Sequence, residues 1–513
     1  MSASAIARSH TAPRKAGLGF WMDRVLEECD RAAVSFAPDP VHDLRVGLRR
    51  CRSMADGLMA LDPDPAWKQM KKAGKQLFSR LGELRDAQVM QEWVHRLDSP
   101  GDPVTSKLLE FLAFREAQWK QEAARALADF DRKQWRRWSK LLPRRAARLQ
   151  PGTVVFKHLA LERWTEAHEL HRQALRNRSQ AAFHRLRIGL KRFRYITENF
   201  LPEHHLGWGS ELKELQDVLG EIHDLDVLWS TAQQVDVFPE AEARARWRSR
   251  IQQERMGRVE KYREKMLGSN APWQIWRAAL PSGEQIGAAA LRRLKVWASF
   301  LDPDVKHSNH VARLALALFD GLAAIGGGAQ LPDRPREILR LAALLHDVGR
   351  SRSEKGRQKA SHGLIRRLHP PLGVSAADLQ LAGVVARYHR GALPRVGQKA
   401  LGSIARSERK MLLRLAAILR LADAFDGERN GAIGSLEVGW RNDLIVVQAQ
   451  GYSPLDPVAE RVAAARHLLE VVYRRPVMVK PLRPAPVQAP KAKSARARKL
   501  VATPSLPRAS GLG

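Results

Sequence analysis

The chain of 513 residues has only two cysteines, Cys29 and Cys51. Two cysteines are too few for a disulfide framework, and these two do not form the closely spaced pair typical of a metal site. The first 20 residues lack the apolar run of a signal peptide, and no run of about 18 apolar residues occurs that could span a bilayer. We therefore expect a cytoplasmic protein with neither an export signal nor a membrane span.

Acidic residues are scarce relative to basic ones. Lys and Arg total 87 against 54 Asp and Glu, which gives a formal net charge of +33. An excess of this size repels itself in a compact fold unless a polyanion offsets it. The expected class of partner is therefore a nucleic acid, an anionic membrane or a phosphate polymer, and composition does not choose among them.

Strand-like alternation of apolar and polar residues is also rare, whereas apolar residues recur at helical spacing through most of the chain. We predict a mainly α fold, and a chain of this length suggests two to four domains at about 100 to 200 residues each. The exception is 433–480, where two β-rich runs flank Arg441-Asn442-Asp443 and predict a hairpin followed by a helix. The ends, 1–17 and 481–513, are predicted to be a flexible N-terminus and a disordered basic tail.

The first half contains an internal duplication. The segment VHDLRVGLRRCR at 41–52 recurs as FHRLRIGLKRFR at 183–194. A second shared element, LGELRDAQV at 81–89, recurs as LGEIHDLDV at 219–227. Both elements keep their order and approximate separation, so residues 18–270 are predicted to be two copies of one helical unit.

The repeated segments have one basic and one apolar face when they are drawn as helices. The pair Asp39-Pro40 predicts an N-cap and first residue for the earlier helix. Cations stacked without carboxylates repel by about 0.2–0.5 kcal/mol per pair. Such a run usually marks a solvated face, but identical spacing in two copies favours a binding site, and guanidinium groups bind phosphate oxygens through paired N–H donors.

The candidate anion ligands are the cations of these two helices, extended by lysines from a neighbouring helix. They are Arg45, Arg49, Arg50, Arg52, Arg187, Lys191, Arg192 and Arg194, together with Lys68, Lys72 and Lys75. A general nucleic-acid binder is disfavoured because these ladders lack interleaved aromatic residues on which bases stack.

The duplicated H-x-x-R-x-x-x-R/K-R-x-R helices and the L-G-x-x-x-D segments resemble the CHAD domain. The resemblance implies a helical bundle with a basic central groove or pore that binds inorganic polyphosphate, with the ladder cations as phosphate ligands. It also implies polyphosphate granules as a place of action. Asp86 and Asp224 match the acidic positions of the family, and we expect them to orient arginines through ion pairs.

The second half offers metal-capable side chains on three apolar helices. They are His307, the adjacent pair His346-Asp347, and Asp423. A single buried His or Asp is more often a cap or a satisfied core residue, but a set on successive helices favours a metal site. Neutral imidazole with carboxylate suits Mn, Mg, Fe or Zn, and a divalent metal could activate water for attack on phosphorus.

Four blocks of this half, HSNHVARLALALFDGL, LAALLHDVGR, VVARYHRGALPR and LRLADAFDG, resemble the HD phosphohydrolase superfamily. They are most similar to the C-terminal domain of the exopolyphosphatase and guanosine-pentaphosphatase family. The resemblance implies an all-helical HD domain over 290–432, after a linker at 271–289. Its catalytic candidates are Asp347 and His389, and the candidate phosphate ligands around them are Arg350, Lys355, Arg357, Arg387 and Arg390.

This chain departs from that family at two points. No actin-like ATPase-type domain precedes the segment, so we expect that exopolyphosphatase activity is not inherited. Residues 358–362 read QKASH where the family pattern has an H-K-H-S block, which argues against a second metal ion.

Two functions therefore stay open. In the first, a polyphosphate-binding protein carries an HD domain that hydrolyses polyphosphate or a phosphorylated nucleotide. In the second, the HD domain is degenerate and the protein is a non-catalytic scaffold on polyphosphate granules. If the four ligands share one metal, loss of Asp347 abolishes metal binding. Because clustered carboxylates repel without metal, we expect Asp347→Asn to leave the fold as stable as before or slightly more stable.

Overall fold

The computed structural model describes residues 17–98, 101–268, 271–325, 333–395, 397–402 and 404–482. Residues 1–16 and 483–513, which hold nearly all of the predicted flexible N-terminus and basic tail, lie outside these ranges. The fold is mainly α-helical with a small three-stranded sheet near its C-terminal end, which confirms the predicted fold class. Every helix in the described ranges is too short or too polar to cross a membrane.

The first half consists of two copies of a four-helix unit joined by α5 (Arg132–Ala146). The first copy contains α1 (Leu18–Ser35), α2 (Pro38–Leu58), α3 (Pro65–Leu97) and α4 (Pro103–Ala128), and the second contains α6 (Val154–Asn177), α7 (Gln180–Phe200), α8 (Pro202–Gln234) and α9 (Ala241–Met266). The last three helices of the unit have 21, 33 and 26 residues in both copies. The equal lengths agree with the internal duplication.

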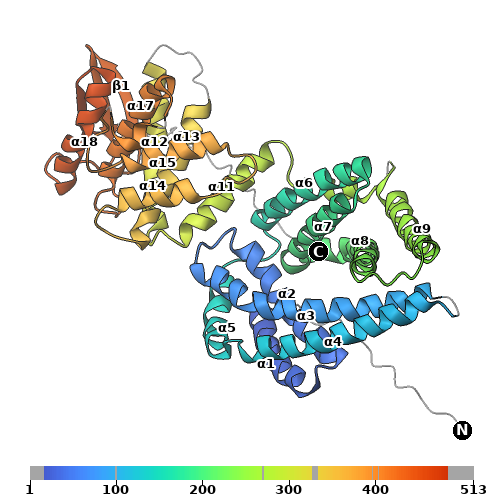
Figure 1. Cartoon of the computed structure of the whole chain (residues 1–513). Coiled ribbons are helices and arrows are strands. Elements are labelled where there is room, and N and C mark those ends of the chain that lie inside the picture. Colours follow the sequence, from blue (N-terminus) through green and yellow to red (C-terminus); the bar gives the residue numbers. More distant parts are fainter. Residues whose placement is uncertain are drawn as a thin grey trace, which may run out of the picture.

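The two copies meet through equivalent helices, α2 with α7 and α3 with α8 (Figure 1). At one end, Gly57 of α2 packs against Phe200 and Ile196 of α7. At the other end, a hydrophobic cluster that includes Trp93 of α3 and Trp247 of α9 joins the helix tips. Apolar packing at both ends therefore fixes the spacing of the helices between them.

The start of α2 differs from the prediction. The helix begins at Pro38, and its N-cap is Ala37, which makes no side-chain cap hydrogen bond. Asp39 lies inside the first turn, so its predicted role as the N-cap is wrong. Pro38 takes the first helical position because its fixed φ and missing N–H cost nothing there.

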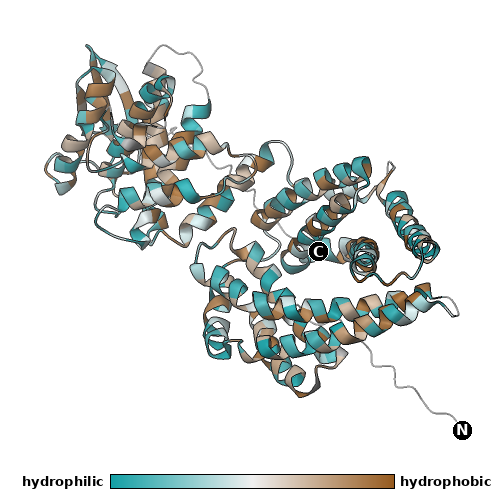
Figure 2. Ribbon diagram, in the orientation of Figure 1, coloured by the Kyte–Doolittle hydropathy of each residue, from teal (hydrophilic) through white to brown (hydrophobic). Residues whose placement is uncertain are grey.

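The second half is a helical bundle that buries the apolar faces of its helices against one another (Figure 2). Its elements are α11 (Glu284–Ser299), α12 (Val305–Ile325), α13 (Asp333–Leu345), η1 (Val348–Ser351), α14 (Arg357–Arg367), α15 (Ala376–Arg387), α16 (Lys399–Gly402) and α17 (Arg406–Phe425). Its core contains Leu339 of α13 and Leu419 of α17, both fully buried. These helices carry the predicted metal ligands at their ends or on their inner faces.

The predicted hairpin is present as β1 (Leu436–Arg441) and β2 (Leu444–Ala449), which pair antiparallel. Its two turn residues, Asn442 and Asp443, have φ of 44° and 64°, as a two-residue type I′ turn requires. The predicted helix follows as α18 (Pro457–Tyr473). The sequence did not predict β3 (Val477–Pro481), which pairs parallel with β2.

The two halves are in contact rather than tethered by a free linker. Residues 271–289 contain α10 (Pro272–Ala278), which places two tryptophans in the core of the first half, and the start of α11. Arg293 of α11 is 8% exposed and pairs with Glu162 of α6 at 2.6 Å. Glu162 also accepts a hydrogen bond of 2.8 Å from the backbone N–H of Leu372. The half-buried carboxylate of Glu162, in the first half, thus binds two elements of the second half.

The contact between the two copies predicts a sensitive glycine. In Gly57→Ala, the added Cβ would overlap the Phe200 ring and lie 3.1 Å from Ile196 Cδ1. We expect a loss of about 1–3 kcal/mol in the free energy of unfolding, measured as a lower midpoint of chemical denaturation. The control is Gly257→Ala in the exposed part of α9, where no atom lies within 4 Å of the added Cβ. It should leave stability unchanged or raise it. Equal effects of the two changes would contradict this account of the contact.

Candidate functional site

A basic groove lies between the two copies, lined by α2, α3, α7 and α8. Its volume is about 380 Å³, and it continues into a recess of about 190 Å³. Arg52, Phe78 and Lys191 line both parts. The predicted cations that line this continuous surface are Arg45, Arg49, Arg52, Lys75, Arg187, Lys191 and Arg192. The structure thus brings cations from both copies to one place.

The other predicted cations lie elsewhere. Arg50 forms an ion pair with Glu198, whose second oxygen lies 3.8 Å from Arg194. This shared carboxylate ties α2 to α7 and partly neutralises both arginines. Lys68 and Lys72 are exposed on α3 and do not line the groove. A helical projection shows which cations share a face of one helix. It does not show which of them face the other copy.

The groove holds more positive charge than its own acids balance. Burial, reinforced by the surrounding arginines with Arg187 first, lowers the pKa of Lys191 to about 8. Burial also lowers the pKa of Arg45 and of Arg52. Their guanidinium carbons lie 5.7 and 5.0 Å from the centroid of the Phe78 ring, whose face favours cations. A multivalent anion in this groove would relieve the repulsion.

Asp86 and Asp224 also line the groove, but among the described residues neither forms the predicted ion pair with an arginine, and nearby arginines act on both only through longer-range attraction. Arg45 instead donates a hydrogen bond of 2.7 Å to the backbone carbonyl of Leu81, so a backbone contact orients this side chain. Burial raises the pKa of Asp224 to about 6, against the opposing effect of Arg187. The predicted orienting role is therefore wrong, and the two acids reduce the positive charge of the groove only from a distance.

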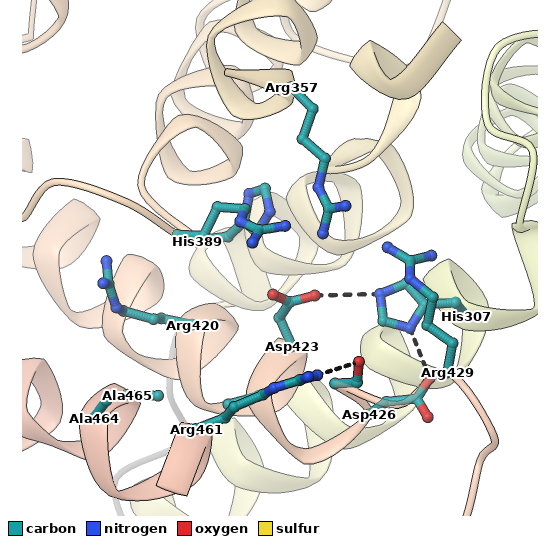
Figure 3. Close-up of a pocket in the computed structure, with 13 residues that line it drawn as sticks. His307, Arg357, His389, Arg420, Asp423, Asp426, Arg429, Arg461, Ala464 and Ala465 are labelled. Atoms are coloured by element: carbon teal, nitrogen blue, oxygen red, sulfur yellow. Dashed lines mark hydrogen bonds and ion pairs between the residues drawn. The ribbon is translucent and has the colours of Figure 1, made fainter. Parts of the chain in front are cut away.

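In the second half, the four predicted metal ligands converge. His307 lies on α12, His346 and Asp347 directly follow α13, and Asp423 lies on α17. His307 Nε2 is 3.2 Å from Asp423 Oδ1, and His346 Nε2 is 3.5 Å from the same oxygen and 3.9 Å from Asp347 Oδ2. Figure 3 shows Asp423 and His307 as direct neighbours that face each other in the pocket.

His389 joins this cluster from the end of α15. Two overlapping groups, His307 with His346 and Asp347, and His346 with His389 and Asp423, each have their ligand atoms within 4.8 Å of one another. Each group of three donors can therefore approach one ion, and His346 belongs to both groups. His346, Asp347 and His389 are at most 1% exposed.

The Nδ1 atom of each imidazole already has a partner. His307 Nδ1 faces Asp426 at 2.7 Å, and His346 Nδ1 and His389 Nδ1 face backbone carbonyls at 2.7 and 2.6 Å. An Nδ1 that donates to these oxygens leaves its lone pair on Nε2. Nε2 of His307 and of His346 then face carboxylate oxygens, which is repulsive unless a positive charge lies between them.

Without an ion, a second proton on His307 meets this requirement. Burial acts to lower the pKa of His307, but its hydrogen bonds to Asp423 and Asp426 outweigh burial and raise the pKa to about 9. Burial likewise opposes ionisation of Asp423, yet His307 and His346 hold its pKa well below the usual range. His389 Nε2 is buried without a hydrogen-bond partner. The donor set therefore fits a divalent cation, bound through imidazole and carboxylate groups.

Two supporting residues escaped the sequence analysis. Asp426 orients His307, and its signal was its place three residues after Asp423, on the same face of the helix end. Ser361 accepts a hydrogen bond of 2.9 Å from Gly349 N and donates one of 2.6 Å to the carbonyl of His346. Ser361 belongs to the segment that departs from the family pattern, and it stabilises the turn after α13.

A pocket of about 570 Å³ opens beside the cluster and is lined by arginines. Arg357 and Arg390 were predicted as phosphate ligands, whereas the sequence analysis missed Arg420, Arg429 and Arg461. The remaining predicted cations are outside the lining: Arg350 pairs with Glu354, Arg387 stacks on Tyr388, and Lys355 is exposed. Arginine-rich walls beside a metal-capable cluster suit a phosphorylated substrate.

Comparisons with known families agree with the division into two halves. Residues 22–233 match the model of the CHAD domain, and residues 295–444 match the model described as Ppx/GppA phosphatase, domain III. The chain joins a CHAD domain to a Ppx/GppA domain III. Both predicted resemblances are thereby confirmed, while the wider HD assignment stays a prediction.

A crystal structure of the CHAD domain from the plant Ricinus communis is similar to part of the chain. It has 23% sequence identity, covers 52% of this chain and 90% of that chain, and has a TM-score of 0.34. The fold similarity is too low to carry a residue-level argument. No curated protein matches the chain.

Within domain III, Asp347 lies between two guanidinium groups. Arg429 donates a hydrogen bond to Oδ2, and Arg357 Nε lies 3.1 Å from Oδ1. Burial acts to raise the pKa of Asp347, but His346 and Arg429 outweigh burial and lower the pKa to about 2. The premise that the carboxylate at position 347 is uncompensated is wrong, because Arg357 and Arg429 lie beside it, and we therefore expect Asp347→Asn to be destabilising.

The CHAD groove predicts a pH dependence. As pH rises through about 6, Asp224 gains a negative charge, and as pH rises through about 8, Lys191 loses its positive charge. Both changes weaken the binding of a polyanion, so affinity for long-chain polyphosphate should fall in two steps between pH 5 and 9.5, by up to about tenfold per unit in the upper step. Fluorescence titrations at constant ionic strength measure this. Asp224→Asn should remove the lower step and Lys191→Arg the upper one. A profile that neither substitution alters would contradict the assignment.

The ion pairs of Asp347 predict a loss of stability. Asp347→Asn leaves Arg357 and Arg429 without their buried carboxylate, so metal-free protein should lose about 2–4 kcal/mol in the free energy of unfolding. The wild-type advantage should be present above about pH 4 and disappear as pH falls through about 2, because the folded-state pKa is lowered. Denaturation followed by circular dichroism measures both. The control is Asp443→Asn at the exposed hairpin turn, and a stability of Asp347→Asn equal to this control would refute the compensation.

Proposed function

We propose that this protein binds inorganic polyphosphate in the CHAD groove and hydrolyses a phosphorylated substrate in domain III with a divalent metal. The observation that carries the proposal is the convergence of His307, His346, Asp347, Asp423 and His389 beside a pocket lined by arginines. The CHAD match supports a polyphosphate-related function, and the domain III match supports a phosphatase activity.

The groove supports a phosphate polymer as the first ligand. Its cations lie at helical spacing on two facing helices, so they form a row along which a chain of regularly spaced charges can bind. The aromatic ring that lines both parts, Phe78, lies beside the guanidinium groups of Arg45 and Arg52. This arrangement supports polyphosphate over single-stranded nucleic acid, which depends on free ring faces for base stacking.

In domain III, we assign His307, His346, Asp347 and Asp423 to hold Mn, Mg, Fe or Zn. A divalent cation bound there supplies a Lewis acid that polarises a phosphoryl oxygen. Arg357 and Arg429 lie next to Asp347 and neutralise negative charge on the phosphoryl group. His389 presents the lone pair of Nε2, because its Nδ1 faces the carbonyl of Ala386. It therefore accepts a proton from an attacking water more readily than it donates one.

A second candidate function is a non-catalytic scaffold on polyphosphate granules. The ion pair of Arg429 with Asp347 favours it, because the arginine already neutralises one proposed metal ligand. In that case the five polar side chains serve only to hold helices together.

Phosphate release by the full chain tests the proposal. Purified protein with Mn²⁺, Mg²⁺, Zn²⁺ or Fe²⁺ should release phosphate from tripolyphosphate or from long-chain polyphosphate, and Asp423→Asn should abolish both release and bound metal. The triple substitution Arg45→Ala, Arg187→Ala, Lys191→Ala should weaken binding of long-chain polyphosphate by about 100-fold or more. It should leave metal content and release from tripolyphosphate intact.

The outcomes separate the two functions. Protein that contains no metal and releases no phosphate from polyphosphate or a guanosine polyphosphate supports the scaffold. Unchanged affinity of the triple variant would remove the CHAD groove as the binding site. The control for the groove is Lys68→Ala, which changes an exposed lysine outside the lining.

A further inference from the structure

The pocket of domain III has a wall that the family match does not cover. The match ends at residue 444, whereas α18 contributes Arg461, Ala464 and Ala465 to the pocket lining. Figure 3 shows the two alanines beside Arg461, on the side of Asp423 away from His307. Because Ala464 and Ala465 have small side chains, they leave space in the pocket next to the Arg461 guanidinium.

Local geometry holds Arg461 in place. Its guanidinium donates a hydrogen bond to the carbonyl of Gly427, and Nη2 lies 3.0 Å from Glu428. A Cβ at position 427 would lie 2.7 Å from Arg461 Nη1 and 2.9 Å from its Cδ. Glycine therefore allows the arginine to lie against the loop that follows α17. The pair with Glu428 is exposed on both sides and contributes little to stability.

Arg420 provides a second cation on the same side. It lies one turn before Asp423 on α17 and donates a hydrogen bond of 2.8 Å to the carbonyl of Gly391. Its Nη1 atom is buried without a hydrogen-bond partner. In Figure 3, Asp423 lies between Arg420 and Arg429. A guanidinium with an unsatisfied donor in a pocket is available to an anionic ligand.

The two sides of the pocket differ in charge. Near the cluster, Arg357 and Arg429 are paired with Asp347. On the far side, Arg420 forms no ion pair with a described carboxylate, and Arg461 pairs only with the exposed Glu428. A volume of about 570 Å³ is typical of sites for whole small molecules. It exceeds what one phosphoryl group at the cluster requires.

We propose that Arg420 and Arg461 form a second phosphate subsite, which binds the phosphate group linked to the one held at the metal cluster. The inference rests on the proposed function of domain III and narrows its substrate to compounds with at least two linked phosphates. The ligand class is a linear oligophosphate. Phosphate monoesters engage only the cluster and lack the contacts on α17 and α18.

Calorimetric titration of the full chain tests the subsite. The groove triple variant serves as background, so that the CHAD domain does not contribute. With Mn²⁺ present, Arg461→Gln and Arg420→Gln should each weaken tripolyphosphate binding by about tenfold or more, as expected for a hydrogen bond to a charged group. Binding of inorganic phosphate should change less than about twofold. The matched control is Arg466→Gln, which lies on the same helix outside the pocket, bonded to Val477 O at 3.2 Å.

Three results would overturn the subsite. These are tripolyphosphate affinity unchanged in both variants, equal losses for tripolyphosphate and phosphate, and no tripolyphosphate binding by the background protein. The readout is binding, so it is separate from turnover. A selective loss of tripolyphosphate affinity in a protein that releases no phosphate would refute the hydrolase proposal and leave the subsite standing. If both substitutions leave turnover and tripolyphosphate affinity unchanged, the subsite is refuted and the hydrolase proposal stands.

Discussion

In both halves of this protein, apolar packing holds side chains of like charge close together. The rest of the structure depends on this constraint. In the CHAD domain, Arg45, Arg52, Arg187 and Lys191 share one groove with few carboxylates. The acids of the groove and the Phe78 ring offset the repulsion between these side chains only in part. The cations stay there because fully buried residues such as Leu44 and Leu190 fix the helices that carry them. Burial lowers the pKa of Lys191, and the neighbouring arginines add to the shift.

Domain III combines a centre that gathers negative charge with a neighbouring pocket that gathers positive charge. Its centre gathers carboxylates and imidazole lone pairs, which require a positive charge between them, while its pocket gathers arginines. Asp347 belongs to both, since it faces His346 on one side and Arg357 and Arg429 on the other. A cation at the centre and an oligophosphate in the pocket would satisfy the two requirements together. The same arrangement predicts that Asp347 contributes to stability as well as to the proposed metal site.

The contact between the halves links the helices of the groove to the helices of the pocket. Glu162 of α6 meets Arg293 of α11 and the backbone of Leu372, which follows α14. The helix α6 packs against α7 with its groove cations, and α14 begins with Arg357 of the pocket. Polyphosphate bound in the groove, as proposed, would therefore lie on helices that contact the helices supporting the pocket of domain III.

Much of this could be predicted from the sequence, because it depends on spacing along the chain. Helical periodicity predicted the mainly α fold, the repeated segments predicted the duplication, and Asn442-Asp443 between β-rich runs predicted the hairpin. His307, His346, Asp347 and Asp423 stood out because polar residues interrupted apolar helices. Each of these signals can be read from the order of residues within short segments, or from a comparison of two such segments.

Only the tertiary structure decided which residues meet across long separations. It assigned Arg50 and Arg194 to Glu198 instead of the groove, and it replaced the predicted ion pair of Arg45 by a hydrogen bond to Leu81 O. It also paired β3 with β2 and brought Arg420, Arg429 and Arg461 into one pocket. No periodic pattern marks these residues, because their positions follow from how separate helices pack rather than from the order of residues within any one of them.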